Sequence, residues 1–237
     1  MLGSQRVSLQ NGFLLHRRNW RETSLLLDFF TLDYGILRLI AKGALRGRQP
    51  RFGVCQPFIP LCLSWTGKSE LPLLTSLESL GAGFNLQGKA LFCGFYLNEL
   101  LMRLVPPHDP HPKLMVSYQD ALARLADDAQ FDPVLRLFEL SLLEEIGYGL
   151  TLDEDCESGG PVHPDKHYLY DVETGPREAV AGPGTLRGST LLALQQRDLS
   201  GAMAFAEAKS LLRRVIQHYL GGRPLKSREL FKSFNSN

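Results

Sequence analysis

The spacing of apolar residues changes near residue 87, and this change constrains the fold more than any other feature. Before it, five short apolar segments are separated by turn signals, without the crossover helices that parallel strands need. These segments are residues 12–18, 23–31, 36–42, 57–65 and 71–79. Short strands that follow one another directly indicate a small closed antiparallel barrel.

After residue 87 the apolar residues recur at helical spacing. The predicted helices are residues 89–105, 114–126, 132–149, 189–194 and 202–222. Asp, Gly and Pro are frequent between residues 150 and 188, which predicts an irregular insertion with a short hairpin around HYLYDVETG. We therefore expect an α+β multidomain protein, with a barrel domain over residues 1–82 and an all-α domain over residues 83–237 that carries this insertion.

Charge is segregated along the chain, although the formal net charge is only +1. Residues 1–68 carry a net +7, residues 69–108 a net −1, residues 109–178 a net −11 and residues 179–237 a net +6. Two basic ends indicate that a polyanion binds one surface, and the acidic middle indicates a different role. The alternative is solvated surface charge that was distributed by chance.

Sequence motifs of enzymes and membrane proteins are missing. The chain has no G-x-S-x-G, H-E-x-x-H or G-x-x-x-x-G-K-[ST] motif, and we assign no catalytic residue. It has no run of eighteen apolar residues, and its N-terminus lacks the apolar core of a signal peptide. We therefore expect a non-enzymatic cytoplasmic protein without a membrane segment.

A metal site has only one candidate location. Cys156, His163 and His167 fall within one loop, and the two histidines have a spacing found in zinc sites. A structural zinc site needs four ligands, however, and the chain has no C-x-x-C. Cys55, Cys62 and Cys93 are scattered, which favours reduced thiols. We predict no metal and no cofactor, with a partial zinc site as the alternative.

Basic residues gather at the ends of the predicted strands. In ILRLIAK, alternation places Arg38 and Lys42 on one face of the strand and Leu37, Leu39 and Ala41 on the face that suits a core. The glycine-punctuated segment AKGALRGRQPRF continues from this strand, and the first strand ends in two arginines. The predicted DNA-binding residues of this region are Arg17, Arg18, Arg38, Lys42, Arg46, Arg48 and Arg51.

Aromatic residues lie close to these cations in the sequence. Trp20, Tyr34, Phe52 and Trp65 are candidates for stacking on nucleic acid bases. The alternative for each of them is a place in the core. Cations that track phosphates, together with rings that stack on bases, predict a barrel that holds single strands.

Several segments give the chain a resemblance to a known family. RRNWRETSLLLDFFTLDYGILRLIAKGALR resembles the N-terminal signature of the bacterial recombination mediator RecO family. QPFIPLCLSW, FYLNELLMRLV, RLFELSLLEEIGYG and YLGGRPLKSRELF resemble its later blocks, so the similarity runs from about residue 12 to residue 231. The last block is the most specific, because so long an ungapped string is unlikely by chance.

The resemblance implies a fold and a function. It implies an N-terminal OB-fold, an all-helical C-terminal domain and a nucleoid-associated role in DNA repair and homologous recombination. It also implies binding of single- and double-stranded DNA, annealing of complementary strands and, with RecR, loading of RecA onto DNA coated by the single-strand-binding protein SSB. Many members carry a four-cysteine zinc site in the loop region, where this chain keeps only Cys156. We therefore expect a zinc-free member.

The partner SSB suggests a second site. Its tail is acidic and ends in apolar residues, so it needs an apolar groove with a local cation. Arg136, beside Leu135 and Phe138, is the candidate for this role. The alternative is a helix-surface arginine that pairs with a neighbouring glutamate.

The segment after the last helix is basic as well. Arg223, Lys226 and Arg228 are predicted to extend the DNA-binding surface, or the segment packs back on the barrel through its apolar residues. Two rival functions remain. One is a protein-interaction scaffold that docks the SSB tail and touches DNA incidentally. The other is a hydrolase that uses the acidic residues of 150–173 with a metal.

Overall fold

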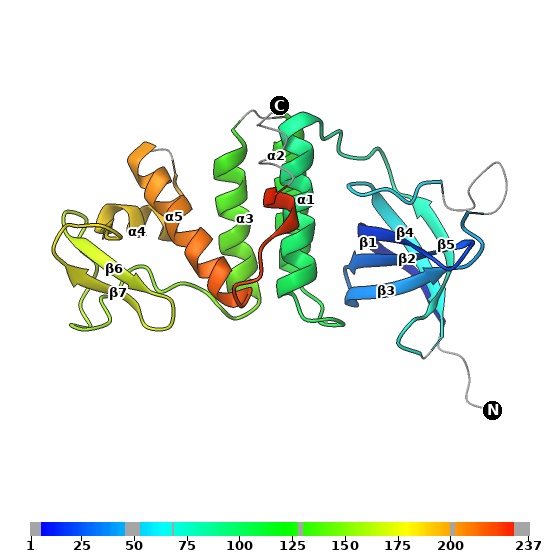
Figure 1. Ribbon diagram of the computed structural model, residues 1–237, viewed down its shortest axis with the longest axis horizontal. Coiled ribbons are helices and arrows are strands. Elements are labelled where there is room, and N and C mark those ends of the chain that lie inside the picture. Colours follow the sequence, from blue (N-terminus) through cyan, green and yellow to red (C-terminus); the bar gives the residue numbers. More distant parts are fainter. Residues whose placement is uncertain (1–5, 46–52, 68, 128–129, 200–201, 230–237) are drawn as a thin grey trace. The chain divides into compact units, whose positions relative to one another are not determined.

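The computed structural model describes residues 6–45, 53–67, 69–127, 130–199 and 202–229 (Figure 1). Its elements are β1 (Arg6–Trp20), β2 (Ser24–Thr31), β3 (Gly35–Ala41), β4 (Pro60–Thr66), β5 (Leu73–Ser79), α1 (Gly88–Leu104), α2 (Pro112–Asp127), α3 (Phe131–Glu145), β6 (His167–Asp171), β7 (Gly175–Ala179), β8 (Leu186–Arg187), α4 (Gly188–Gln195) and α5 (Ala202–Tyr219). The expected fold class, a five-stranded sheet followed by a helical region with a hairpin insertion, is confirmed.

The first five strands close into a barrel in the order β1-β2-β3-β5-β4, because β4 also pairs with β1. A five-stranded barrel of this kind is the OB architecture. The first strand begins at Arg6, six residues before the expected start at residue 12. Register shifts between Val7 and Gln10 and between Leu14 and His16 let this one long strand follow two neighbours.

The alternation expected in β3 is present. Leu37, Leu39 and Ala41 are buried in the barrel core, whereas Arg38 is exposed. Trp65 belongs to the same core, with 5% of its surface exposed, and its ring meets Tyr34 edge to face at 5.1 Å. The core alternative therefore holds for Trp65.

Helices α1 and α2 pack on the outside of the barrel through a buried polar chain. Asn98 Nδ2 donates to the carbonyl of Leu15 at 2.9 Å, and the Tyr118 hydroxyl donates to Asn98 Oδ1 at 2.6 Å. The rings of Phe13 and Phe30 meet Tyr118 edge to face. All eight residues of β2 are buried, and Tyr118 of α2 covers one of them, Phe30.

The connection between α1 and α2 returns to β3 and forms a wall beside the barrel. Pro107 bridges to Ile36, and the His108 amide donates to the Ile36 carbonyl at 2.9 Å. Gly35 makes this approach possible, because its φ is +61° and a Cβ there would lie 2.1 Å from the Asp109 carbonyl oxygen.

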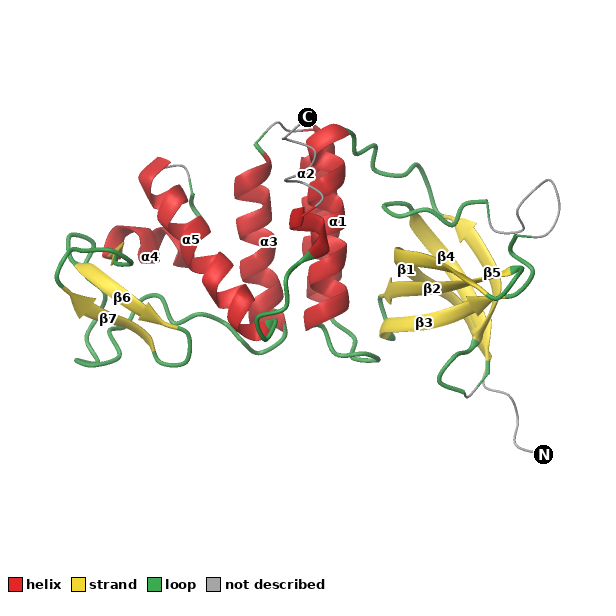
Figure 2. Ribbon diagram, in the orientation of Figure 1, coloured by secondary structure: helices red, strands yellow, loops and turns green. Residues whose placement is uncertain are grey.

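Residues 130–224 contain the remaining elements: helices α3, α4 and α5 and the small sheet of β6, β7 and β8 (Figure 2). The predicted hairpin is β6 and β7, whose register runs from His167 opposite Ala179 to Asp171 opposite Gly175. The predicted helix 132–149 ends earlier, at Glu145, and Gly147 follows with a φ of +84°.

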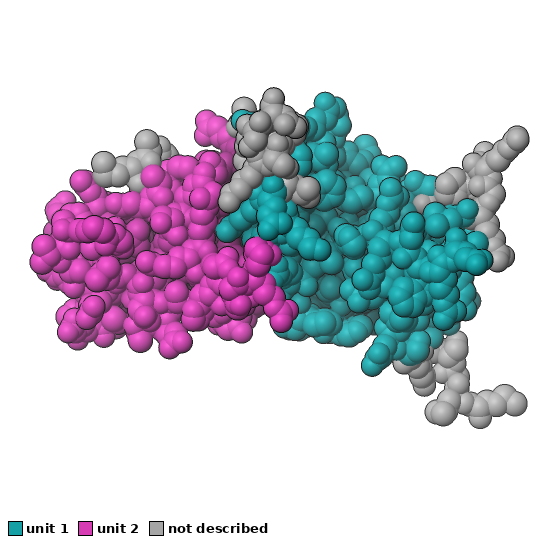
Figure 3. All heavy atoms as spheres, in the orientation of Figure 1, with its two compact units in different colours: residues 1–129, 225–237 teal, residues 130–224 magenta. Residues whose placement is uncertain are grey.

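The chain divides into two compact units by its contacts (Figure 3). Unit 1 comprises residues 1–129 and 225–237, and unit 2 comprises residues 130–224. This grouping does not test the domain division expected between residues 82 and 83, which stays a prediction. Within the described residues, none of the helices is both long and apolar enough to cross a membrane.

Candidate nucleic-acid interface

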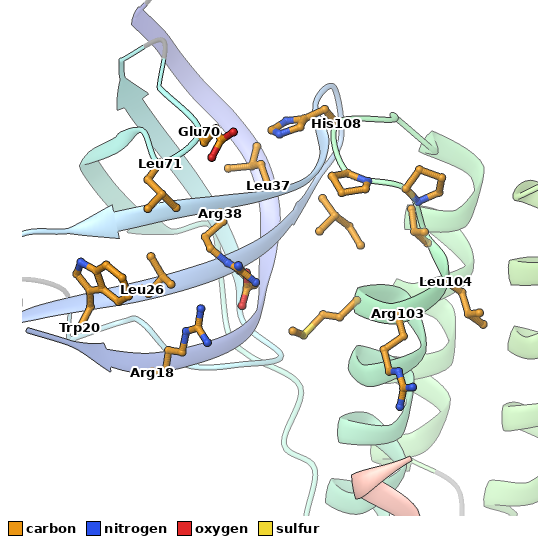
Figure 4. A pocket seen from close by; sticks show the side chains of 16 residues that line it. Arg18, Trp20, Leu26, Leu37, Arg38, Glu70, Leu71, Arg103, Leu104 and His108 are labelled. Atoms are coloured by element: carbon orange, nitrogen blue, oxygen red, sulfur yellow. The ribbon is translucent and has the colours of Figure 1, made fainter. Parts of the chain in front are cut away.

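Two adjoining hollows in unit 1 form a groove on the outer face of the barrel. One has a volume of about 670 Å³ and lies between the barrel and the residues that end α1 (Figure 4). The other, of about 640 Å³, continues past the end of β3. Both are lined by Trp20 and Leu71, so we treat them together as the barrel groove.

The strand register explains which side chains face the barrel groove. Arg18 lies opposite Leu26, and Asp28 lies opposite both His16 and Arg38, so these residues share the outer face of three neighbouring strands. Arg103 and His108 line the other side of the hollow, from α1 and the connection that follows it.

The lining of the barrel groove is cationic. It holds five Lys or Arg side chains and two carboxylates. The cations are Arg18, Arg21, Arg38, Lys42 and Arg103, and the carboxylates are Asp28 and Glu70. Four of these cations come from the barrel, and alternation in the sequence had predicted the outward-facing charge of two of them, Arg38 and Lys42. This lining attracts an anionic chain without providing a pattern of donors that could select one base.

The floor of the barrel groove is apolar, and one ring stands at its middle. Leu26 and Ile36, which lie on the same outer face as Arg38, are 1% and 8% exposed. Trp20 is half-buried at the point where the two hollows meet. An indole beside an apolar floor suits stacking of an unpaired base, because every base offers an aromatic face.

One carboxylate is built into this cationic surface. Asp28 is 4% exposed, and its Oδ1 accepts from Arg38 Nε at 2.5 Å. His16 Nδ1 lies 3.6 Å from its Oδ2. Sequence reasoning did not find this role of Asp28, although its place in the apolar segment SLLLDFF was a signal for a buried charge with partners.

Arg17 lies on the opposite face of β1 from Arg18, and its guanidinium binds the backbone of the segment before β4. Its Nη1 donates to the Cys55 carbonyl at 2.9 Å. Cys55 is buried, and this burial raises the pKa of its thiol to about 11, against the opposing effect of the Arg17 charge. Arg46, Arg48 and Arg51, which continue from Lys42 in the sequence, lie outside the described residues.

The predicted C-terminal cations fall in different units. Arg223 is the exposed last cation of unit 2. Lys226 and Arg228 belong to unit 1, where Arg228 Nη2 donates to the Tyr96 hydroxyl of α1 at 3.2 Å. Lys226 is exposed.

The side chain of Arg136 is buried, with 3% of it exposed. Its Nη2 donates to Glu139 Oε1 at 2.6 Å, so the pairing with a glutamate is present but not at the helix surface. Phe138 is 2% exposed and Leu135 is half-buried. Within the part of the chain that the structure describes, Nε and Nη1 of Arg136 have no hydrogen-bond partner.

The loop of Cys156 is organised by a carboxylate. Asp155 accepts hydrogen bonds from the amides of Glu157, Ser158 and Glu178, and the bonds from Ser158 contribute most to the lowered pKa of its carboxyl. Among the described residues, no group of three His, Cys, Asp or Glu side chains could hold a metal ion.

Comparison with known proteins gives the same family over both halves of the chain. The family model "Recombination protein O N terminal" matches residues 6–82, and "Recombination protein O C terminal" matches residues 85–229. A protein of Methylococcus capsulatus named DNA repair protein RecO is 53% identical over 228 residues, which cover 96% of this chain and 94% of that protein. A protein of Nitrosospira multiformis with the same name is 44% identical over 97% of both chains.

Proposed function

Because the chain belongs to the RecO family of DNA repair and recombination proteins, we propose that it binds single- and double-stranded DNA in the barrel groove and anneals complementary strands. One observation carries this proposal: five cationic side chains surround an apolar floor and the ring of Trp20 on one face of the barrel. Arg46, Arg48 and Arg51 continue the cationic surface from Lys42 in the sequence.

The proposed mechanism is electrostatic, and no covalent bond is made or broken in it. Each phosphate that Arg18, Arg38 or Lys42 neutralises releases condensed counterions, which favours binding without regard to sequence. Two complementary strands repel each other through their phosphates. A surface that neutralises part of this charge lowers the repulsion that opposes pairing, while Trp20 keeps bases available by stacking. The protein therefore acts as a mediator and not as an enzyme.

The family also suggests the setting in which this surface works. We propose that the protein, together with RecR, helps to load RecA onto DNA coated by SSB in the nucleoid region of the cytoplasm. The OB-fold would hold the DNA, and unit 2 would serve protein partners. We assign no residues to the contact with RecR.

A strand-annealing assay with two complementary oligonucleotides tests the proposal. The double variant Arg18→Ala/Arg38→Ala should anneal them at least tenfold more slowly at low salt. Arg124→Ala is the matched control, because Arg124 lies on α2 and pairs with Asp120 within the same helix. Equal annealing by wild type and the double variant would remove the barrel groove from the mechanism.

A second function, docking of the SSB tail, is favoured by Nε and Nη1 of Arg136, which have no hydrogen-bond partner among the described residues. A buried guanidinium with open donor positions suits a carboxylate ligand, since charge-assisted hydrogen bonds gain strength away from water. Because Arg136 is buried, an incoming tail must first displace the side chains that cover it.

The tail-binding function is tested with a peptide of the SSB C-terminus and fluorescence anisotropy. Arg136→Ala alone would leave Glu139 buried without this partner, which is destabilising. The double variant Arg136→Met/Glu139→Met removes both charges and keeps the volume. It should bind the peptide at least tenfold more weakly, with DNA binding unchanged. Unaltered peptide binding would contradict the assignment of Arg136.

A further inference from the structure

The end of the chain returns to unit 1 and docks on α1 through one carboxylate. Glu99 accepts hydrogen bonds from the Lys226 amide at 3.0 Å, from the Ser227 amide at 2.8 Å and from the Ser227 hydroxyl at 2.7 Å. These are the first amides of the helical turn 226–229, so a side chain of α1 caps a helical turn that lies 127 residues later in the chain. We call residues 225–229 the strap.

Apolar and aromatic contacts complete the docking. Leu225 is 2% exposed and Ser227 is 6% exposed. The Arg228 guanidinium lies 5.4 Å from the centre of the Tyr96 ring, in addition to its hydrogen bond to the hydroxyl. The strap therefore has one buried side. Lys226 contributes its backbone amide to the docking, and its side chain is exposed.

Arg103 connects the strap to the barrel groove. Its Nη1 lies 3.7 Å from Glu99 Oε1, one turn away on α1. The same residue lines the first hollow of the barrel groove, where Figure 4 shows it on the side opposite Arg18 and Arg38. Groove, Arg103, Glu99 and strap thus form an unbroken series of neighbours within unit 1.

We propose that the docked strap is a second section of the DNA-binding surface, which takes the sugar–phosphate backbone where a strand leaves the barrel groove beside Arg103. Lys226 and Arg228 supply the cations, and Glu99 holds them in place. This inference rests on the proposed function, because it extends the path of the same strand. A nucleic acid backbone fits because Lys226 is exposed and Arg228 is half-buried, and such cations contact the phosphates of any sequence equally.

Two single variants and two oligonucleotide lengths test the inference. One OB-fold holds roughly 4–16 nucleotides, so an oligothymidylate of about 8 nucleotides fills the barrel groove alone, whereas one of about 30 also reaches the strap. Lys226→Ala removes one exposed cation and leaves the backbone bond to Glu99. Arg177→Ala, which removes an exposed cation from β7 of unit 2, is its control.

Glu99→Ala is the sharper variant, because two explanations predict opposite signs. If Glu99 acts only through its negative charge, its removal tightens DNA binding. If it holds the strap, its removal releases Lys226 and Arg228, and the long oligonucleotide binds more weakly. Binding of the short oligonucleotide reports whether the barrel groove remains folded in this variant.

We expect Lys226→Ala to lower the salt-dependence slope for the long oligonucleotide by about 0.7, the value for one single-strand phosphate contact, without effect on the short one. We expect Glu99→Ala to weaken binding of the long oligonucleotide at least threefold. Equal or tighter binding of the long oligonucleotide by Glu99→Ala would overturn the strap inference and leave the barrel groove proposal intact. Failure of the wild type to bind the short oligonucleotide would overturn the proposed function itself.

Discussion

Arg38 and Asp28 lie directly opposite each other on β3 and β2, with Arg38 Nε 2.5 Å from Asp28 Oδ1. The arginine side chain is 44% exposed and the aspartate side chain 6% exposed, so a buried carboxylate holds a cation at the edge of the barrel groove. His16 approaches the other oxygen at 3.6 Å. A phosphate that binds Arg38 must therefore compete with Asp28.

Replacement of Asp28 should strengthen DNA binding. Asp28→Asn keeps the shape and an acceptor oxygen but removes the competing charge, so we expect affinity for single strands to rise several-fold at low salt and the salt slope to steepen by about 0.7. Fluorescence titration at several salt concentrations measures both. Asp33→Asn is the control, because Asp33 is an exposed carboxylate of the β2–β3 turn. If Asp33→Asn has the same effect as Asp28→Asn, only net charge matters and the competition is refuted.

Trp20 should contribute by stacking. Trp20→Ala is expected to weaken binding of single-stranded DNA by about 1–3 kcal/mol, or roughly 5- to 150-fold, whereas Trp20→Phe retains most of the affinity. Trp65→Ala should behave differently, because Trp65 is a core residue and its loss costs about 3–5 kcal/mol of unfolding free energy. Anisotropy and urea unfolding separate the two effects. If Trp20→Ala leaves the affinity for single-stranded DNA unchanged, no base stacks on Trp20.

The buried polar chain that joins α1 and α2 to the barrel should be needed for stability. Tyr118→Phe removes the hydroxyl that donates to Asn98 and leaves a buried oxygen without this donor, so we expect a loss of about 1–3 kcal/mol in the free energy of unfolding. Urea unfolding of the full chain measures it. The control is Tyr148→Phe, at a tyrosine that is 46% exposed. A change equal to that of the control would mean that the hydrogen bond contributes nothing net.

The docking of the strap should depend on pH through Glu99. Burial alone would raise the pKa of this carboxyl, but the hydrogen bonds from Ser227 and Lys226 and the charge of Arg103 together lower it. The stabilisation is therefore fully present above the ordinary value of 4.5 and is lost as the pH falls through the lowered pKa of the docked state.

An NMR titration of the Glu99 carboxyl carbon measures this directly. Ser227→Ala removes one donor, so the pKa of Glu99 should move up toward its ordinary value. An identical pKa in wild type and Ser227→Ala would contradict the role of the Ser227 hydroxyl.

Local patterns were sufficient to predict the individual elements. The alternation of ILRLIAK placed Arg38 outside and Leu39 inside, and turn signals separated the strands, because both depend on residues close in sequence. The family was also identified correctly from blocks of sequence.

Long-range contacts could not be predicted in the same way. Part of the second wall of the barrel groove is the α1–α2 connection, which returns to Gly35 and Ile36, more than seventy residues earlier in the chain. Glu99 looked like an ordinary helical carboxylate, and its partners Lys226 and Ser227 lie far along the sequence. The buried position of Arg136 likewise depends on packing that a basic residue among apolar neighbours does not reveal.

The central claim is that exposed cations of the barrel groove hold DNA through its phosphates. It is tested most directly by the dependence of single-strand affinity on salt for wild type and for the triple variant Arg18→Ala/Arg38→Ala/Lys42→Ala. With about 0.7 for each phosphate contact, the log–log slope of the variant should be flatter by about 2. A triple variant with the slope and affinity of the wild type would contradict the account.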